Sequence, residues 1–75
     1  MAKRIPMLKA RDIMRALRAL GFSPMRQSGS HIFFQHGDGR TTLVPRHGGE
    51  DMGRGLLRQI LREIKMTPDE FVKHL

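Results

Sequence analysis

Two clusters of turn-forming residues bracket an aromatic stretch in the middle of this sequence. Gly29-Ser30 precedes the stretch, Gly37-Asp38-Gly39 follows it, and residues 31–36 between them include the adjacent Phe33 and Phe34. Turn signals on both sides of a short apolar segment predict a β-strand joined to its neighbours by tight hairpins. His31 is therefore expected at the start of a strand, where its side chain can be exposed while a sheet fixes its backbone.

The flanking segments extend this strand into a three-stranded meander. Phe22–Ser28 is predicted to be the first strand, and Pro24 within it favours an edge position or a bulge. Residues 40–44 are rich in β-branched side chains and are predicted to form the third strand, which Pro45 stops. Alternation along the central strand leaves both of its faces partly apolar, so the sequence does not indicate which face meets the core.

Helical periodicity appears on both sides of the meander. Residues 9–20 carry apolar side chains at helical spacing, with arginines on the opposite side and Gly21 at the expected end. A second apolar stripe runs from about Gly55 to Ile64. Thr67-Pro68-Asp69-Glu70 has the form of a capping box with proline at the first helical position, and it predicts a short last helix that buries Phe71 and Leu75.

The order helix, three strands, helix and short helix predicts an α+β fold similar to that of double-stranded-RNA-binding domains. The 75 residues are enough for one domain with a small core, so residues 1–75 are expected to fold as a single unit. The sequence has no cysteine, which excludes disulfides and thiolate metal sites. No apolar run approaches the length of a membrane span, and a cytoplasmic protein is expected.

The strong positive charge indicates the class of partner. The sequence has fourteen lysines and arginines and seven acidic residues, which gives a formal net charge of +7 that is spread along the chain. Such a balance favours nucleic acid as the first partner to consider, although a merely basic surface would give the same number. On base rates the arginine stripes of the two longer helices are solvated faces.

The histidines are the candidate catalytic groups. An imidazole free of strong neighbours titrates at about pH 6.5, so His31 can take up or release a proton near neutral pH; a structural hydrogen bond is the alternative role. His36 is an auxiliary candidate, although alternation places it on the opposite face of the strand from His31. Histidines without cysteines and with few carboxylates nearby are a weak zinc signal, and neither a metal nor another cofactor is expected.

A glycine-rich connection leads into the second helix and can form a phosphate-binding nest. Gly48-Gly49 and the helix start at Gly53-Arg54-Gly55 supply backbone amides, whereas Glu50 and Asp51 would repel RNA. An ordinary flexible connection is about as consistent with this composition. The residues expected to contact RNA are Arg26, Ser30, Arg40, Arg46, His47, Gly48, Gly49 and Arg54.

Five segments together carry a family resemblance. They are, in order, Gly21-Phe22, Gly29-Ser30-His31, His36-Gly37-Asp38-Gly39-Arg40, Val44-Pro45-Arg46-His47-Gly48-Gly49 and Leu57-Arg58-Gln59-Ile60-Leu61-Arg62. In this order and spacing they resemble the pattern of the HicA toxins, the small mRNA interferases of HicA–HicB toxin–antitoxin pairs. The chain departs from that pattern at Gly37, often proline in the family, and at Gly55-Leu56, where the family has Gly-Thr.

The resemblance implies a metal-independent endoribonuclease of a type II toxin–antitoxin system that cleaves mRNA with one catalytic histidine, here His31. It also implies a HicB-like antitoxin that covers this site. The toxin alone is expected to be monomeric. Two other classes stay open: a non-catalytic module that binds double-stranded RNA through the same fold, and a protein that binds only an acidic partner.

Overall fold

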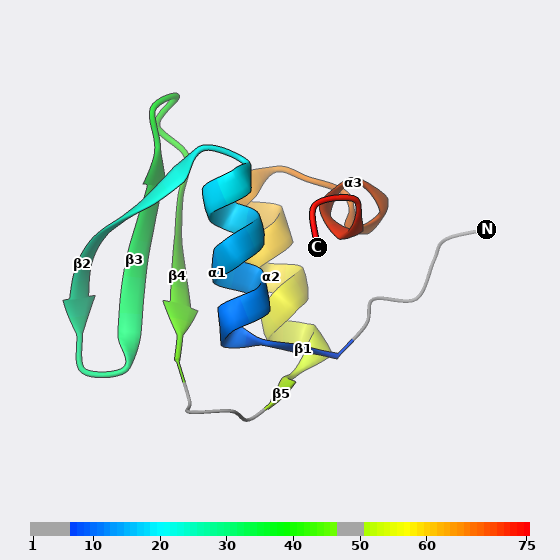
Figure 1. Ribbon diagram of the computed structural model, residues 1–75, viewed down its shortest axis with the longest axis horizontal. Coiled ribbons are helices and arrows are strands. Elements are labelled where there is room, and N and C mark those ends of the chain that lie inside the picture. The colour runs from blue at the N-terminus through cyan, green and yellow to red at the C-terminus, as the bar shows by residue number, and fades with distance from the viewer. Residues whose placement is uncertain (1–6, 47–50) are drawn as a thin grey trace.

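The three predicted strands form one antiparallel sheet in the order β2-β3-β4 (Figure 1). The computed structural model describes residues 7–46 and 51–75, and the predicted α+β fold, with helices before and after the sheet, is confirmed in them. The elements are β1 (Leu8–Lys9), α1 (Ala10–Ala19), β2 (Phe22–Ser28), β3 (His31–His36), β4 (Thr41–Pro45), β5 (Asp51–Met52), α2 (Arg54–Ile64) and α3 (Pro68–Val72).

The hairpins have the tight turns that the sequence predicts. Ser28 pairs with His31 across a two-residue turn in which Gly29 adopts a positive φ of 58°. At the other end of β3, the turn through residues 37–39 is closed by the amide of His36, which donates to the carbonyl of Arg40 over 2.8 Å. The register of β2 shifts between Pro24 and Arg26, which confirms the bulge expected next to the proline.

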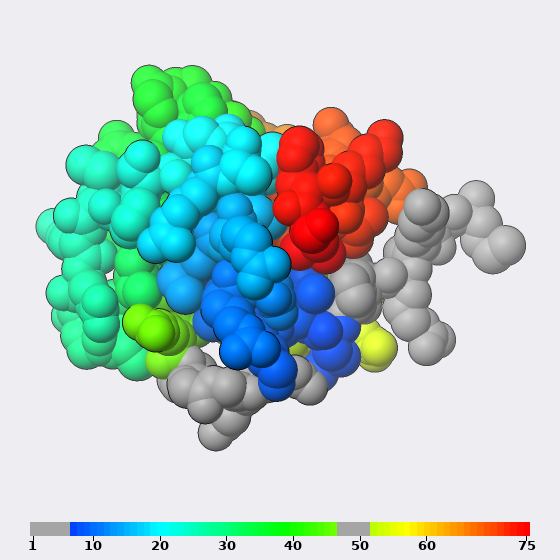
Figure 2. All heavy atoms as spheres, in the orientation of Figure 1, coloured from blue at the N-terminus to red at the C-terminus, as the bar shows by residue number. Residues whose placement is uncertain are grey.

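One face of the sheet packs against α1 and α2, which lie on the same side of the strands in Figure 1. In the space-filling view α1 lies between the strands and the C-terminal segment (Figure 2). Even-numbered side chains of β3 point to this side, because Phe34 is fully buried and Ile32 is 8% exposed. The core also takes side chains from β4, from both long helices and from α3, namely Val44, Ile13, Leu17, Leu57, Ile60, Ile64 and Phe71.

The helix ends follow from local sequence. Asp12 accepts a hydrogen bond from the backbone amide of Lys9 at 3.3 Å, which satisfies a donor just before α1. Gly21, with φ of 98°, follows Leu20, the residue that caps the end of α1. Thr67 and Glu70 form the predicted capping box at α3, since the Glu70 amide donates to the Thr67 hydroxyl and the Thr67 amide donates to the Glu70 carboxylate.

Several details differ from the sequence-based expectation. Pro45 is the last residue of β4 and not the residue after it. β4 is an edge strand, and such a strand tolerates a proline because the backbone amide that proline lacks is not needed as a donor to a neighbouring strand. Leu75 is 47% exposed, so the expectation that it is buried is wrong; α3 has a single turn, and Phe71 is its buried side chain. The two-residue ribbon of β1 and β5 was not predicted, because segments this short carry no periodic signal.

No helix in the described parts of the chain is long and apolar enough to cross a membrane.

Candidate functional site

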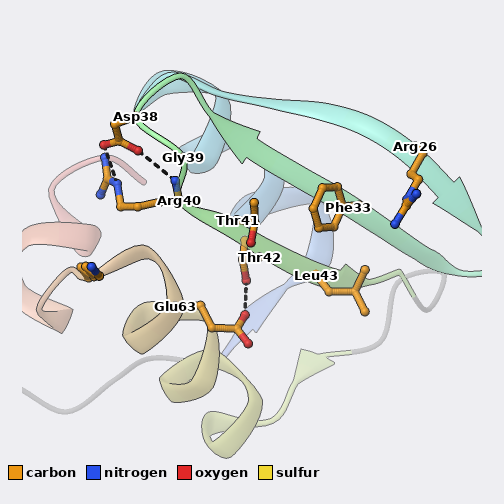
Figure 3. Close-up of a pocket in the computed structure, with 10 residues that line it drawn as sticks. Arg26, Phe33, Asp38, Gly39, Arg40, Thr41, Thr42, Leu43 and Glu63 are labelled. Carbon is orange, nitrogen blue, oxygen red and sulfur yellow. Dashed lines mark hydrogen bonds and ion pairs between the residues drawn. The ribbon is translucent and has the colours of Figure 1, made fainter.

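The face of the sheet that points away from the helices, here called the open face, carries the candidate site. Strand alternation and register bring together side chains from three strands on this face. Arg26 lies opposite Phe33, and Phe33 lies opposite Leu43 on the other neighbouring strand. In Figure 3 these three side chains project from adjacent strands toward a common hollow.

His31 is exposed at the beginning of β3, as predicted. Its neighbours across the sheet are Ser28 on β2 and Pro45 on β4. The preceding turn is held from the other side, because the amide of Arg46 donates to the carbonyl of Ser30 over 2.6 Å. The backbone of His31 is therefore fixed on both sides, while its imidazole makes no hydrogen bond or ion pair with any residue that the structure describes.

The open face is hollowed around His31. One hollow, of about 310 Å³, is lined by Arg26, Ser28, His31, Phe33 and Leu43. A second, of about 210 Å³, continues from His31 and Pro45 to side chains of α2, among them Leu56 and Gln59. His31 thus lies where the sheet and the first half of α2 meet.

Another hollow, of about 740 Å³, does not include His31. It runs from Arg26, Phe33 and Leu43 along β4 to Glu63 and Lys65 (Figure 3). It shares Arg26, Phe33 and Leu43 with the hollow that contains His31, so the two are parts of one groove. An extended ligand can occupy both parts, and His31 lies at one end of the groove.

Polar groups of both signs line this groove. The guanidinium of Arg26 lies 5.2 Å from the centre of the Phe33 ring, in a cation–π arrangement at the surface. Glu63 brings a carboxylate from α2, which accepts a hydrogen bond from the hydroxyl of Thr42 at 2.7 Å. Thr42 is 3% exposed, so this bond satisfies a buried hydroxyl and fixes the Glu63 carboxylate beside β4.

His36 and Arg40 lie at the opposite end of β3 from His31. The two histidines are five positions apart along the strand, which is about 16 Å, and their side chains point to opposite faces. His36 packs edge-on against Phe22 with 5.0 Å between ring centroids. An added Cβ at Gly21 would lie 2.9 Å from His36 Nε2, so the ring occupies the space above the glycine. The structure does not bring His36 to His31.

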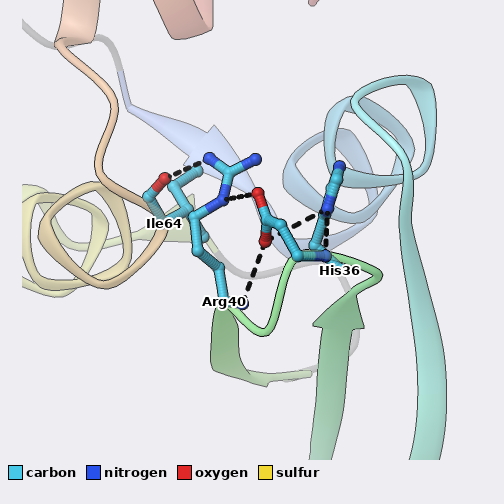
Figure 4. A network of polar contacts seen from close by, with 4 residues as sticks. His36, Arg40 and Ile64 are labelled. Carbon is cyan, nitrogen blue, oxygen red and sulfur yellow. Dashed lines mark hydrogen bonds and ion pairs between the residues drawn. The ribbon is translucent and has the colours of Figure 1, made fainter.

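The Nδ1 atom of His36 closes the turn in either protonation state. It lies 3.0 Å from the amide of Asp38 and 3.1 Å from a carboxylate oxygen of the same residue (Figure 4). A neutral Nδ1 accepts from the amide, whereas a protonated one donates to the carboxylate, and the two contacts are alternatives. We therefore assign His36 a role in the hairpin.

Arg40 ties the hairpin to the end of α2. Its guanidinium donates to the carbonyl of Ile64 over 2.5 Å and to the Asp38 carboxylate over 2.8 Å (Figure 4). It also lies 5.1 Å from the centre of the Phe22 ring. The amide of Arg40 donates to the Asp38 carboxylate, and this bond, followed by the contacts of the guanidinium, lowers the pKa of that carboxyl. The guanidinium of Arg40 is thus already bound by other groups of the protein. Contact between Arg40 and RNA stays a prediction.

The other predicted RNA contacts divide into three groups. Arg26, Ser30 and Arg46 lie at the His31 end of the sheet. Arg54 is the first residue of α2, whose first half borders the same hollow. His47, Gly48 and Gly49 lie outside the described residues.

Sequence reasoning missed Ser28, Phe33 and Leu43 as lining of the site. The signal for Phe33 was available, because it is two residues after His31 on the same strand and so shares its face. Within residues 7–46 and 51–75, no three histidine or acidic side chains gather as a metal site would require. The arrangement offers one imidazole for proton transfer, with a guanidinium and an aromatic ring in the same groove.

The sequence matches a known protein family. Residues 10–66 match the family described as the HicA toxin of bacterial toxin–antitoxin systems. This match covers α1, the sheet and α2, and includes His31 and the groove around it. No curated protein matches the sequence at a significant level. Because the match extends over most of its length, the chain belongs to the HicA toxin family.

Proposed function

We propose that this chain is a metal-independent endoribonuclease that cleaves mRNA, with His31 as its one catalytic histidine. The observation that carries the proposal is the placement of His31: the imidazole is exposed in a groove, on a fixed backbone, and is not engaged by any described residue. A proton-transfer group must reach its substrate directly, and this placement allows that.

The chemistry follows from the substrate. The 2′-hydroxyl of RNA loses its proton, forms a bond to the adjacent phosphorus and displaces the 5′-oxygen of the next nucleotide, which takes up a proton. The products are a 2′,3′-cyclic phosphate and a 5′-hydroxyl end. His31 takes the proton from the 2′-hydroxyl or gives one to the leaving oxygen, and because the nucleophile belongs to the substrate, the step requires no metal-bound water.

Positive charge at the same end of the sheet supports binding of the reacting phosphate. Arg26 borders the groove beside His31, and the exposed Arg46 follows Pro45, which lies opposite His31. A fixed guanidinium next to a phosphate stabilises the charge that develops as the 2′-oxygen attacks. Arg26 and Arg46 are therefore the arginines that we expect to matter most for cleavage.

Incubation of the purified protein with structured and unstructured RNA tests the proposal. Cleavage into fragments with cyclic phosphate ends is the expected result. Retention of intact double-stranded RNA would instead favour the non-catalytic binding module, to which the fold and the exposed arginines of α1 and α2 are also suited. Absence of any effect of RNA would leave only binding to an acidic protein partner.

We further propose a HicB-like antitoxin as the partner of this toxin in the cytoplasm, with the toxin alone a monomer. An acidic antitoxin surface would pair with the basic side chains of this protein, whose formal net charge is +7, and would cover His31. Association should therefore be fast and weakened by salt. A co-expressed antitoxin is expected to co-purify, to stop cleavage and to protect His31 from a histidine-modifying reagent. A tight complex in which His31 stays reactive and RNA is still cut would contradict neutralisation by occlusion.

A further inference from the structure

Phe33 differs from every other aromatic side chain of the protein. The sequence has four phenylalanines and no tyrosine or tryptophan. Phe22, Phe34 and Phe71 are each at most 2% exposed and belong to the core. Phe33 is half-buried on the open face, with the exposed Leu43 beside it on β4. A small domain has few large apolar side chains available for its core, so an aromatic ring placed outside it calls for another role.

The surroundings of the ring suit a flat and negatively charged ligand. The Arg26 guanidinium lies 5.2 Å from the ring centre, on the strand opposite Leu43. Nucleobases stack on aromatic rings and on guanidinium planes, while the phosphates beside them are attracted to the cation. A nucleotide uses both groups at once, because its base can stack on the ring while its phosphate pairs with the guanidinium.

From these contacts we propose that Phe33 and Arg26 form a stacking subsite for one nucleobase of single-stranded RNA, next to the nucleotide on which His31 acts. The inference rests on the proposed function and specifies its substrate: an unpaired strand that lies along the groove of the open face. Phe33 is a binding and positioning residue in this scheme, and His31 remains the proton-transfer group.

An unpaired strand fits the placement of the two side chains. Phe33 and His31 are two residues apart on one face of β3, which is about 6.6 Å along the strand. A base in a duplex is stacked between its neighbours and paired along its edge, so its face is not available to the Phe33 ring. An unpaired base can be splayed out onto the ring, with the next nucleotide at His31.

A strand held in this way also favours the reaction. The attacking 2′-oxygen must line up with the departing 5′-oxygen, and a nucleotide constrained in a helix is not free to rotate into that alignment. Stacking of one base on Phe33 fixes the neighbouring phosphodiester near His31 while leaving its sugar free to turn. The binding energy of the stacked base is then used to position the reacting atoms.

The test uses a short single-stranded oligonucleotide whose 2′-hydroxyls are methylated, so that it binds without being cut. Phe33→Leu removes the ring and keeps an apolar side chain, and roughly 10-fold weaker binding is expected from the usual contribution of base–aromatic stacking. Phe33→Trp should bind as tightly as the wild type, because it restores a ring. Met25→Ala, which shortens a side chain that is 58% exposed and not among those lining the groove, is the matched control and should leave binding unchanged.

A second oligonucleotide series separates stacking from a general loss of structure. Scanning an abasic nucleotide along the strand should identify one position at which the wild type loses roughly 10-fold in affinity and Phe33→Leu loses nothing further. Equal affinity of wild type and Phe33→Leu, in a protein that does cleave RNA, would overturn the stacking subsite alone. A wild type that neither binds nor cleaves RNA would instead overturn the proposed function, and equal weakening by Phe33→Leu and Phe33→Trp would point to a different occupant such as the antitoxin.

Discussion

Arg40 and Arg26 are both candidates for RNA contact, and the structure predicts opposite consequences for their removal. Arg40 connects three parts of the fold, because its guanidinium reaches the carbonyl of Ile64, the Asp38 carboxylate and the Phe22 ring. Arg26 is exposed, and among the described residues its guanidinium interacts only with the ring of Phe33. Arg40→Ala should therefore destabilise the fold, and Arg26→Ala should weaken RNA binding.

The size of the Arg40 effect can be worked out from its contacts. The bond to the partly buried Ile64 carbonyl has a charged donor, and such bonds contribute about 1.5–3 kcal/mol. The cation–π contact with buried Phe22 adds about 0.5–1 kcal/mol. The Asp38 contact is in solvent and adds little. Arg40→Ala should thus lower the free energy of unfolding by about 2–4 kcal/mol, and Tm by roughly 10–30 °C for a domain of this size.

Urea and thermal unfolding of the two variants, alongside binding of single-stranded RNA, measure this contrast. Arg26→Ala should lose no more than about 1 kcal/mol of stability, since a surface cation–π contact contributes no more than that. Its RNA affinity should fall, because Arg26 borders the groove beside His31. If Arg40→Ala kept the Tm of the wild type and lost RNA binding, the structural role assigned to Arg40 would be refuted.

Three further results are expected. Gly21→Ala should destabilise the protein by about 1–3 kcal/mol in urea unfolding, because φ is 98° there and the new Cβ would meet the His36 ring at 2.9 Å. Hydrogen bonds from backbone amides lower the pKa of Asp38 and of Glu70 in the folded protein. The two carboxylates should therefore contribute fully to Tm above their ordinary pKa values of 3.8 and 4.5, and this contribution should be lost as the pH falls through the lower folded-state values. The double variant Asp38→Asn, Glu70→Gln should show a smaller fall of Tm at acid pH. Cleavage should persist in EDTA and leave 2′,3′-cyclic phosphate or 3′-phosphate ends, and activity that vanished with EDTA and returned with a divalent ion would contradict the metal-independent step.

The local elements were predictable because each depends on neighbouring residues. The hairpins are specified by Gly29 and by the Gly37-Asp38-Gly39 turn, α3 by the Thr67 and Glu70 capping box, and the long helices by their apolar stripes. These signals act within a few residues of the chain. They fixed the order of elements, and with it the α+β fold.

The parts that could not be predicted depend on contacts between distant residues. Both faces of β3 carry a phenylalanine, so the choice of Phe34 for the core depends on the packing of α1 and α2. In the sequence nothing distinguishes Arg40 from the other arginines of a basic chain, because its partner Ile64 lies 24 residues away. The groove of the open face requires β2, β3, β4 and α2 together, which explains why Leu43 was not expected to line it.

The central claim, that His31 transfers a proton during RNA cleavage, is tested most directly by the cleavage rates of two histidine variants. His31→Ala should fold like the wild type, because the side chain is exposed, and should cleave purified single-stranded RNA roughly 10²- to 10⁴-fold more slowly. His74→Ala changes another exposed histidine, near the C-terminus beyond α3, and should cleave at the wild-type rate. A His31→Ala protein with wild-type Tm and wild-type cleavage rate would remove His31 from the mechanism.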